Sequence, residues 1–261
     1  MPGVPALIGV IHLPPLPGAP RFEGAFETVR ELARQDARTL EAAGFGAIVV
    51  ENFGDAPFFP RAVPPETVAA MAVVAADLRA TTGLPLGVNV LRNDAHAALA
   101  VAAASGAGFV RVNVHTGARV ADQGILEGAA HDTLRLRRAL GLDHVALWCD
   151  VDVKHSAPVH ERPLGDEVAD VVERGLADVV LVTGSRTGAG TDLADVRSVV
   201  AATAKPVVVA SGVTAATVCA TLEVAAGVIV GSALRAGGRP GGPIDAARAR
   251  AFVEAARGGR R

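Results

Sequence analysis

Short apolar runs and alanine-rich stretches alternate eight times along the chain. The apolar runs have the length and branched composition of buried strands, and the stretches between them have helical spacing. Strands are predicted at residues 7–12, 46–51, 85–90, 109–114, 144–150, 178–183, 206–211 and 227–231. This regular succession favours a parallel sheet closed on itself, an α/β fold of the (βα)8 TIM barrel type.

A doubly wound open sheet is the alternative for the same succession of elements. No G-x-G-x-x-G turn follows the first run, which argues against the dinucleotide-binding form of that fold. The length of 261 residues is typical of one barrel, and no linker divides the chain. The sequence therefore predicts one barrel domain over residues 1–261.

The fourth and fifth runs, VRVNVHTGA and LWCDVDVKHS, carry polar side chains toward their carboxyl ends. Side chains on a strand alternate between two faces, and valines occupy one face of both runs. The other face carries Arg111, Asn113, His115, Asp150, Asp152 and Lys154. A solvated edge strand also alternates in this way. Because valines suit packing beneath outer helices, we favour a polar face that looks into a barrel.

Two groups of residues are predicted to act on a ligand at the carboxyl ends of the strands, where parallel barrels place their active sites. The predicted catalytic residues are Glu51, His115, Asp150, Asp152 and Lys154. The residues predicted to bind the rest of the ligand are His12, Asn52, Asn89, Asn93, Arg111, Asn113 and Thr183. Their groups can move protons and hydrogen-bond to hydroxyls.

Lysine is rare in this chain, which has only Lys154 and Lys205 among 25 lysines and arginines. Lys205 precedes Pro206 at the start of a strand, the end of a barrel associated with stability. Lys154 follows two aspartates, which are expected to keep it charged as a proton donor or anion clamp. A Schiff-base role needs a lowered pKa, which paired aspartates disfavour. The alternative is an ion-pair network that closes the barrel.

Small residues follow the last two predicted strands. Ser211 and Gly212 follow the seventh, and Gly231 and Ser232 follow the eighth. Glycine lets backbone N–H groups approach an anion, so these loops are predicted to bind phosphate, together with Gly184. The alternative is that tight turns simply require small residues. Gly184 opens the loop GSRTGAGTD, which is predicted to close as a lid.

A metal site is a further expectation, although the sequence demands no cofactor. Carboxylates and imidazoles could converge above the barrel and bind Mg²⁺, Mn²⁺ or Zn²⁺. The residues concerned are His12, Glu51, His115, Asp150, Asp152 and His155. They form no locally spaced motif such as H-E-x-x-H, so the expectation rests on topology alone.

Composition narrows the classes of partner. The net charge is −2 and aromatic residues make up 3% of the chain, so neither a basic stripe nor stacking platforms for nucleic acid are expected. No apolar stretch reaches the roughly 20 residues that a spanning helix needs. Two cysteines without metal spacing, and a start without a basic leader, predict a cytoplasmic protein. Peripheral membrane attachment and homo-oligomers stay open.

The chain closely resembles the BtpA/SgcQ family in the runs GVIHLPPLPGAPRFEG, IVVENFGDAPF, LGVNVLRNDAHAAL, FVRVNVHTGARVADQGILEG, DVDVKHS, VTGSRTG and SGVT. The resemblance implies a barrel of the ribulose-phosphate-binding type. It also implies a link to photosystem I biogenesis, from a cyanobacterial member, and to sugar metabolism, from the SgcQ branch. Asp152 and Lys154 are similar to the D-x-K-x-x-D motif of the orotidine-phosphate-decarboxylase superfamily, but Ala157 stands at the second aspartate, which argues against decarboxylation.

Together these features predict a barrel that binds a small phosphorylated sugar or nucleoside-type ligand. The expected reaction is of the isomerase, lyase or nucleosidase type, with protons handled near Lys154. The alternative is a non-enzymatic assembly or regulatory factor that keeps the barrel and uses its outer surface. Fold alone does not decide between them.

Overall fold

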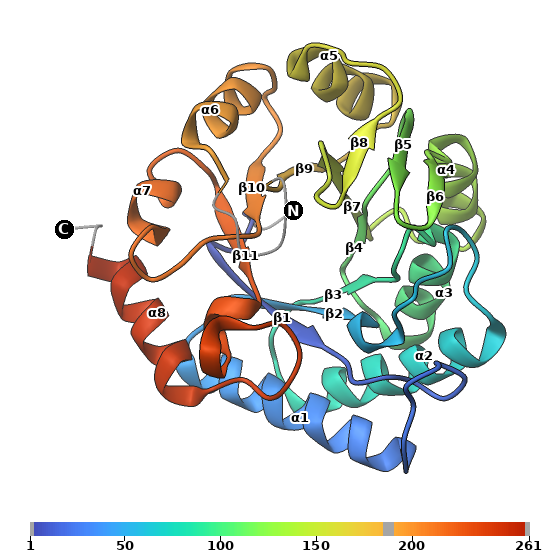
Figure 1. The fold of residues 1–261 in the computed structure, drawn as a ribbon, viewed down its shortest axis with the longest axis vertical. Coiled ribbons are helices and arrows are strands. Elements are labelled where there is room, and N and C mark those ends of the chain that lie inside the picture. The colour runs from blue at the N-terminus through green and yellow to red at the C-terminus, as the bar shows by residue number, and fades with distance from the viewer. Residues whose placement is uncertain (1–2, 185–190, 259–261) are drawn as a thin grey trace.

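The computed structural model describes residues 3–184 and 191–258. Within these residues, eight parallel strands close into a barrel, which Figure 1 shows end-on. In their order around the barrel the strands are β1 (Leu7–His12), β11 (Gly227–Val230), β10 (Val207–Ala210), β9 (Val179–Val182), β7 (Ala146–Val151), β4 (Phe109–Val112), β3 (Leu86–Asn89) and β2 (Ala47–Glu51). The predicted closed barrel and its strands are confirmed.

Helices surround the barrel and connect successive strands (Figure 1). They are α1 (Phe26–Ala43), α2 (Pro65–Thr81), α3 (Ala95–Ser105), α4 (Ala130–Ala139), α5 (Leu164–Ala169), α6 (Leu193–Ala201), α7 (Val218–Leu222) and α8 (Ala246–Gly258). Helix α3 begins after Asp94, whose carboxylate accepts from the N–H of Ala97, and ends at Gly106 in a left-handed conformation. No helix of the described residues is long and apolar enough to cross a membrane.

Alternation along the strands fills the barrel interior. One face of each strand packs against the helices, and the other contributes to an inner cluster that includes Ile8, Val49, Trp148, Leu181 and Ile229. The ring of Phe109 stacks on that of Trp148, with centroids 4.2 Å apart. A Cβ atom at position 87 would lie 2.1 Å from the Phe109 ring, so Gly87 is required for this packing.

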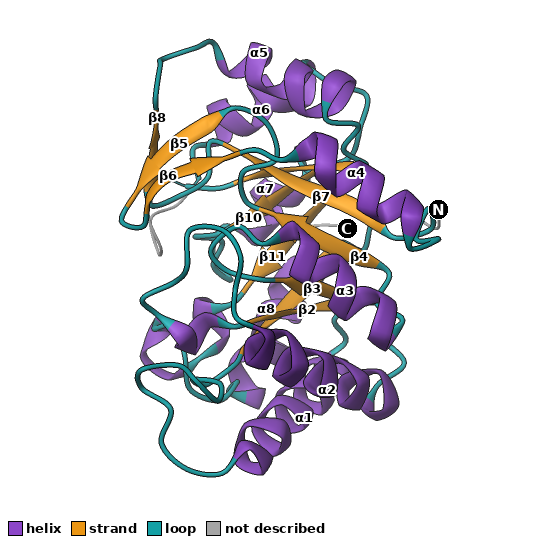
Figure 2. Cartoon of the chain, turned by 90° about the vertical axis from the view of Figure 1, so that its right-hand side faces the viewer, coloured by secondary structure: helices purple, strands orange, loops and turns teal. Residues whose placement is uncertain are grey.

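A small antiparallel sheet stands at one end of the barrel (Figure 2). Its strands, in the order β6 (Gly124–Glu127), β5 (Ala118–Ala121) and β8 (Ser156–Pro158), come from the segments that follow β4 and β7. Leu126 anchors the sheet in a buried cluster with Val114 and Val153. This sheet was not predicted from the sequence, and it covers the side of the barrel mouth where the polar runs end.

Arg235 holds the seam between the first and last strands. Its guanidinium is 1% exposed and donates to the carbonyl oxygens of Val10 (3.0 Å), Gly231 (2.8 Å) and Gly242 (3.0 Å). The carboxylate of Asp36 on α1 lies 3.5 Å away and also accepts from the N–H of Ile244. One buried ion pair therefore joins β1, the end of β11, the following loop and α1.

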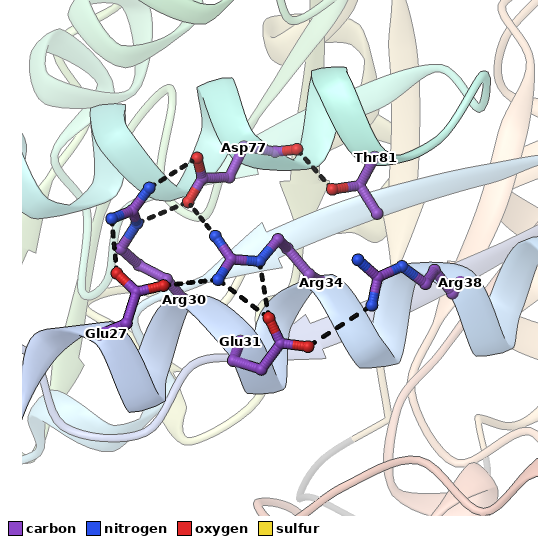
Figure 3. Close-up of polar contacts among 7 residues, drawn as sticks. All are labelled: Glu27, Arg30, Glu31, Arg34, Arg38, Asp77 and Thr81. Carbon is purple, nitrogen blue, oxygen red and sulfur yellow. Dashed lines mark hydrogen bonds and ion pairs between the residues drawn. The ribbon is translucent and has the colours of Figure 1, made fainter.

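Helices α1 and α2 are joined by a network of charged side chains (Figure 3). Asp77 of α2 accepts from Arg30 Nε (2.7 Å) and from Arg34 Nη1 (3.1 Å), both on α1. Arg34 also pairs with Glu27 and Glu31 on its own helix. The hydrogen bond from Arg30 lowers the pKa of Asp77, although partial burial acts the other way. Asp77 is therefore ionised and shared between two arginines.

The variant Asp77→Asn is expected to lower the free energy of unfolding by about 1 kcal/mol at neutral pH, because a network of this kind is worth more than an isolated surface pair. The pKa of Asp77 is lower folded than unfolded, so its stabilisation is complete above the ordinary value near 3.8 and is lost as the pH falls through the folded pKa. Urea unfolding at pH 7 and pH 3 checks this, with Glu254→Gln on α8 as the control. An equal loss at both pH values contradicts it.

Candidate functional site

Polar side chains form the last layer of the barrel interior at the carboxyl ends of the strands. They continue the inward-facing parity of the apolar residues below them, which is why they converge. The layer consists of His12 on β1, Glu51 on β2, Asn89 on β3, Arg111 on β4 and Asp150 on β7. Apart from His12, which is slightly more exposed, all of them are buried.

Arg111 is the centre of this layer. Its Nε and Nη2 atoms donate to the two oxygens of Asp150, both at 3.0 Å, and Nη1 donates to Glu51 Oε1 at 3.2 Å. Asn113 Nδ2 donates to Asp150 Oδ2 at 2.8 Å, and Asn89 Nδ2 donates to Glu51 Oε1 at 3.0 Å. One buried cation is thus held between two buried carboxylates, which fixes its orientation.

Glu51 and His12 are adjacent, and both favour their deprotonated forms, so Glu51 is charged and His12 is neutral. Burial favours the neutral form of Glu51, but Arg111, Lys154 and the Asn89 hydrogen bond outweigh it and lower the pKa of Glu51. Burial, together with the charge of Arg235, lowers the pKa of His12 to about 3. The N–H of Gly241 points at His12 Nδ1 (3.4 Å), which places the proton of the neutral ring on Nε2, 3.8 Å from Glu51 Oε2.

A cavity of about 480 Å³ opens beside this layer. Its wall includes Glu51, Arg111 and Lys154 on one side. On the other side it is lined by the four residues predicted to bind phosphate, Ser211, Gly212, Gly231 and Ser232. The loops after β10 and β11 therefore face the charged layer across one cavity.

The backbone conformation of these two loops lets them pack closely against the polar layer. Ser211 has φ +145° and Gly212 has φ +69°, and the former is a strained conformation for a residue with a side chain. A Cβ atom at position 231 would lie 2.9 Å from the ring of His12, so Gly231 allows this loop to pack against the polar layer. Strain of this kind persists where surrounding structure holds it, often at ligand sites.

Lys154 lines the cavity, and no described residue forms an ion pair with it. Among the described residues its Nζ atom makes no hydrogen bond and no ion pair within 4 Å. Burial and the nearby charge of Arg111 lower its pKa, while Glu51 and Asp150 oppose the shift. Glu51 and Asp150 act on this amine as expected of neighbouring carboxylates, but burial and Arg111 outweigh them, and Asp152 pairs with Arg119 instead.

The segment after β7 is held in place by its backbone. Thr183 Oγ1 accepts from the N–H of Lys154 (2.9 Å) and donates to the carbonyl of Asp152 (3.1 Å). Arg92 Nη2 donates to the carbonyl of Lys154 (2.7 Å). Asp152 itself has φ +48°. Thr183 thus positions the lysine instead of lining the central cavity.

Two residues predicted to be catalytic do not reach the site. His115 is buried with Nε2 2.8 Å from the carbonyl of Gly175, and its Nδ1 has no partner among the described residues. Asp152 is exposed and pairs with Arg119 of β5. Strands β4 and β7 end at Val112 and Val151, so the two-residue alternation no longer applies beyond them.

Three other predicted residues have structural contacts. Asn52 binds the backbone N–H of Leu91 (2.7 Å), and Asn93 binds that of Val114 (2.8 Å). Gly184 is buried beside the end of β9, outside the lining of the central cavity. Residues 185–190 of the predicted lid lie outside the described residues.

The predicted metal ligands do not gather. Across residues 3–184 and 191–258, no group of three or more His, Cys, Asp and Glu side chains is placed to hold a metal ion. Arg111 occupies the space between Glu51 and Asp150, while His115 and Asp152 face other surfaces. A divalent metal remains a prediction from the sequence alone.

Solved structures with the same architecture include thiamine phosphate pyrophosphorylase from Pyrococcus furiosus, with a TM-score of 0.58 and 16% identity over 97% of this chain and 96% of that one. N-(5'-phosphoribosyl)anthranilate isomerase from the same organism has a TM-score of 0.56 and 15% identity, over 97% and 99%. At such low identity these likenesses show the barrel fold.

Sequence relatives are much closer. An uncharacterized protein of Pyrococcus furiosus is 45% identical over 95% of this chain and 93% of its own length. The Photosystem I biogenesis protein BtpA of Synechocystis sp. is also 45% identical, over 95% of this chain and 87% of its own length. The model of the BtpA family matches residues 4–258. The chain therefore belongs to the BtpA family.

Proposed function

We propose that this protein is an enzyme that binds a small phosphorylated sugar or nucleoside-type ligand in the cavity at the carboxyl ends of the strands. The observation that carries the proposal is one continuous cavity with two different walls. The loops after β10 and β11 form the phosphate-binding wall. Glu51, Arg111 and Lys154 form the wall where the sugar reacts.

The names of the two solved structures support the phosphate part of this proposal, since both refer to phosphorylated small molecules. Barrels commonly bind phosphate with the loops after their last two strands, where backbone N–H groups face the anion. Ser211, Gly212, Gly231 and Ser232 occupy those positions here. The position of the phosphate then directs the rest of the ligand toward Lys154.

The reactive wall suits proton transfer next to a carbonyl or a glycosidic carbon. Glu51 is ionised and can accept a proton, and neutral His12 can donate a hydrogen bond from Nε2. Burial and the charge of Arg111 lower the pKa of Lys154, so its ammonium group releases a proton more readily than an exposed lysine does. Arg111 can stabilise negative charge that develops on an oxygen. These groups fit an isomerase, lyase or nucleosidase reaction.

Ribose 5-phosphate or a nucleoside monophosphate is expected to stabilise the protein in a thermal-shift assay. A ligand at about 100 times its dissociation constant adds roughly 2.7 kcal/mol to the stability of the fold. The variant Ser232→Asp is expected to abolish the shift, because it places a negative charge in the phosphate site. The matched control is Ser198→Asp, on the exposed side of α6. A shift that survives in Ser232→Asp would place the ligand elsewhere.

A non-enzymatic assembly role is the second candidate, and the printed name of the Synechocystis relative favours it. In that case the function depends on the outer surface of the barrel, and the cavity has no catalytic role. Lys154→Met is then expected to preserve biological function, whereas substitutions on exposed helix faces abolish it. Complementation of a deletion strain with both kinds of variant separates the two proposals.

A further inference from the structure

A second cavity, of about 500 Å³, adjoins the first at the barrel mouth. The two share Glu51, Phe53, Arg111 and Lys154 in their walls, so a ligand can extend from one into the other. The second cavity lies on the side of β2, β3 and β4, beneath the tip of the β5–β6 hairpin. Its wall adds Arg92, which does not line the first cavity.

Arg92 differs from the other buried arginines of the described chain. Arg111 pairs with Asp150 and Glu51, Arg119 with Asp152 and Glu167, and Arg235 with Asp36. Arg92 is 5% exposed and has no carboxylate within 4 Å among residues 3–184 and 191–258. Its guanidinium makes one hydrogen bond to these residues, to the carbonyl of Lys154. A buried guanidinium is normally paired, so its free donors need a partner.

Lys154 adds a second cation without a direct carboxylate partner to the same wall. Its amine makes no ion pair with the described residues, and Arg111 is already shared between two carboxylates. Asp122 lies on the exposed rim of the cavity, so solvent screens its charge. Asn113 Oδ1 is buried without a partner and can accept from a ligand hydroxyl nearby. Among the described residues, the inner wall thus carries two cations without a carboxylate within 4 Å, a net positive charge when Arg111, Glu51 and Asp150 are included, and one free acceptor.

We propose that the second cavity binds a second anionic group of the substrate, a carboxylate or a phosphate, through Arg92 and Lys154. The inference rests on the proposed function, since the first phosphate is held by the loops after β10 and β11. It narrows the substrate class to phosphorylated sugars that carry a second acidic group. Burial lowers the pKa of Arg92, and a bound anion would offset this desolvation of the guanidinium.

Three open-chain probes of equal length test this inference by calorimetry. Sorbitol 6-phosphate carries one anionic group, 6-phosphogluconate adds a carboxylate, and sorbitol 1,6-bisphosphate adds a phosphate. The wild-type protein is expected to bind at least one of the doubly anionic probes about tenfold more tightly than sorbitol 6-phosphate. Which of the two is preferred identifies the second group.

The variant Arg92→Gln is expected to remove this preference while leaving the affinity for sorbitol 6-phosphate within about twofold of wild type. Arg92→Lys, which keeps the charge, is expected to restore part of the preference. The matched control is Arg79→Gln, since Arg79 also donates to a backbone carbonyl but lies on the surface of α2. Sorbitol 6-phosphate itself reports whether Arg92→Gln still folds with an intact first site.

The possible failures are distinct. If sorbitol 6-phosphate binds and Ser232→Asp abolishes that binding, but no doubly anionic probe binds more tightly, the proposed function stands and the second anion site is refuted. Equal weakening of all three probes by Arg92→Gln also refutes it, because Arg92 then only positions the Lys154 segment. If none of the probes binds to the wild-type protein, the phosphate site and the second site both fall.

Discussion

Replacing Arg111 with methionine is expected to lower the free energy of unfolding by about 3–5 kcal/mol, the cost of leaving buried carboxylates without their cation. Arg111 is the hydrogen-bond partner of both Glu51 and Asp150, and none of the three side chains is more than 8% exposed. Methionine fills a similar volume, so the loss reports charge more than packing. Chemical denaturation at pH 7 measures it.

The stability loss of Arg111→Met is expected to depend on pH. In the native protein the pKa of Glu51 is lowered, so its stabilisation is present above its ordinary pKa and is lost as the pH falls through the folded value. Without Arg111, burial raises the pKa of Glu51. Protonation of Glu51 then removes an unpaired buried charge from the variant. The deficit of Arg111→Met is therefore expected to shrink toward pH 4.

A double variant provides the control. Adding Asp150→Asn to Arg111→Met removes one of the two unpaired charges, so the double variant is expected to be more stable than Arg111→Met alone. The stability losses of the two substitutions are then less than additive, as expected for residues that interact directly. A loss below about 1 kcal/mol in Arg111→Met would show that the buried carboxylates are compensated by other groups.

The variant Lys154→Met is expected to reduce kcat by about 10²–10⁴ once a substrate has been identified, which is the range for loss of a group that transfers protons. Lys154 is the one lysine that lines the cavity, and its amine is free of other partners in the described chain. Methionine preserves the length and the apolar contacts of the side chain. The Kd for sorbitol 6-phosphate, which has no second anionic group, should change far less than kcat.

The pH profile distinguishes a chemical role from a structural one. Because the pKa of Lys154 is lowered from about 10.5, a rate that needs the neutral amine should rise with pH and level off below that value. This limb should disappear in Lys154→Met and persist in the control Lys205→Met, at the opposite end of a strand. A loss of less than tenfold in kcat removes Lys154 from the chemistry.

Most of the fold was predictable from the length of the apolar runs and from their alternation with helical stretches. Eight apolar runs specify eight strands because a buried parallel strand needs valine and isoleucine on both faces. The β5, β6 and β8 sheet was missed because Arg119 and Leu126 are the only buried residues in its three strands, whereas the equally short barrel strands are buried throughout. Such strands carry too few apolar residues to be distinguished from a loop.

The predicted site residues of the polar layer lie within the strands, whereas Asn113 and Lys154 reach the cavities from beyond the strand ends. Glu51, Arg111 and Asp150 lie within their strands, and parity placed them together. His115 and Asp152 lie beyond the strand ends, where turns set the direction of the side chain. Arg92 was missed because arginine is this chain's usual surface cation, so nothing in the sequence distinguishes a buried one.

The seam held by Arg235 has a consequence for how the protein is made. β1 pairs with β11, so the first strand to leave the ribosome lacks one neighbour until the last strand has been synthesised. Arg235, 225 residues after Val10 and two dozen before the end of α8, then joins the two ends. Until that moment the nascent chain exposes an open edge along β1, which is the stage at which a chaperone is most useful.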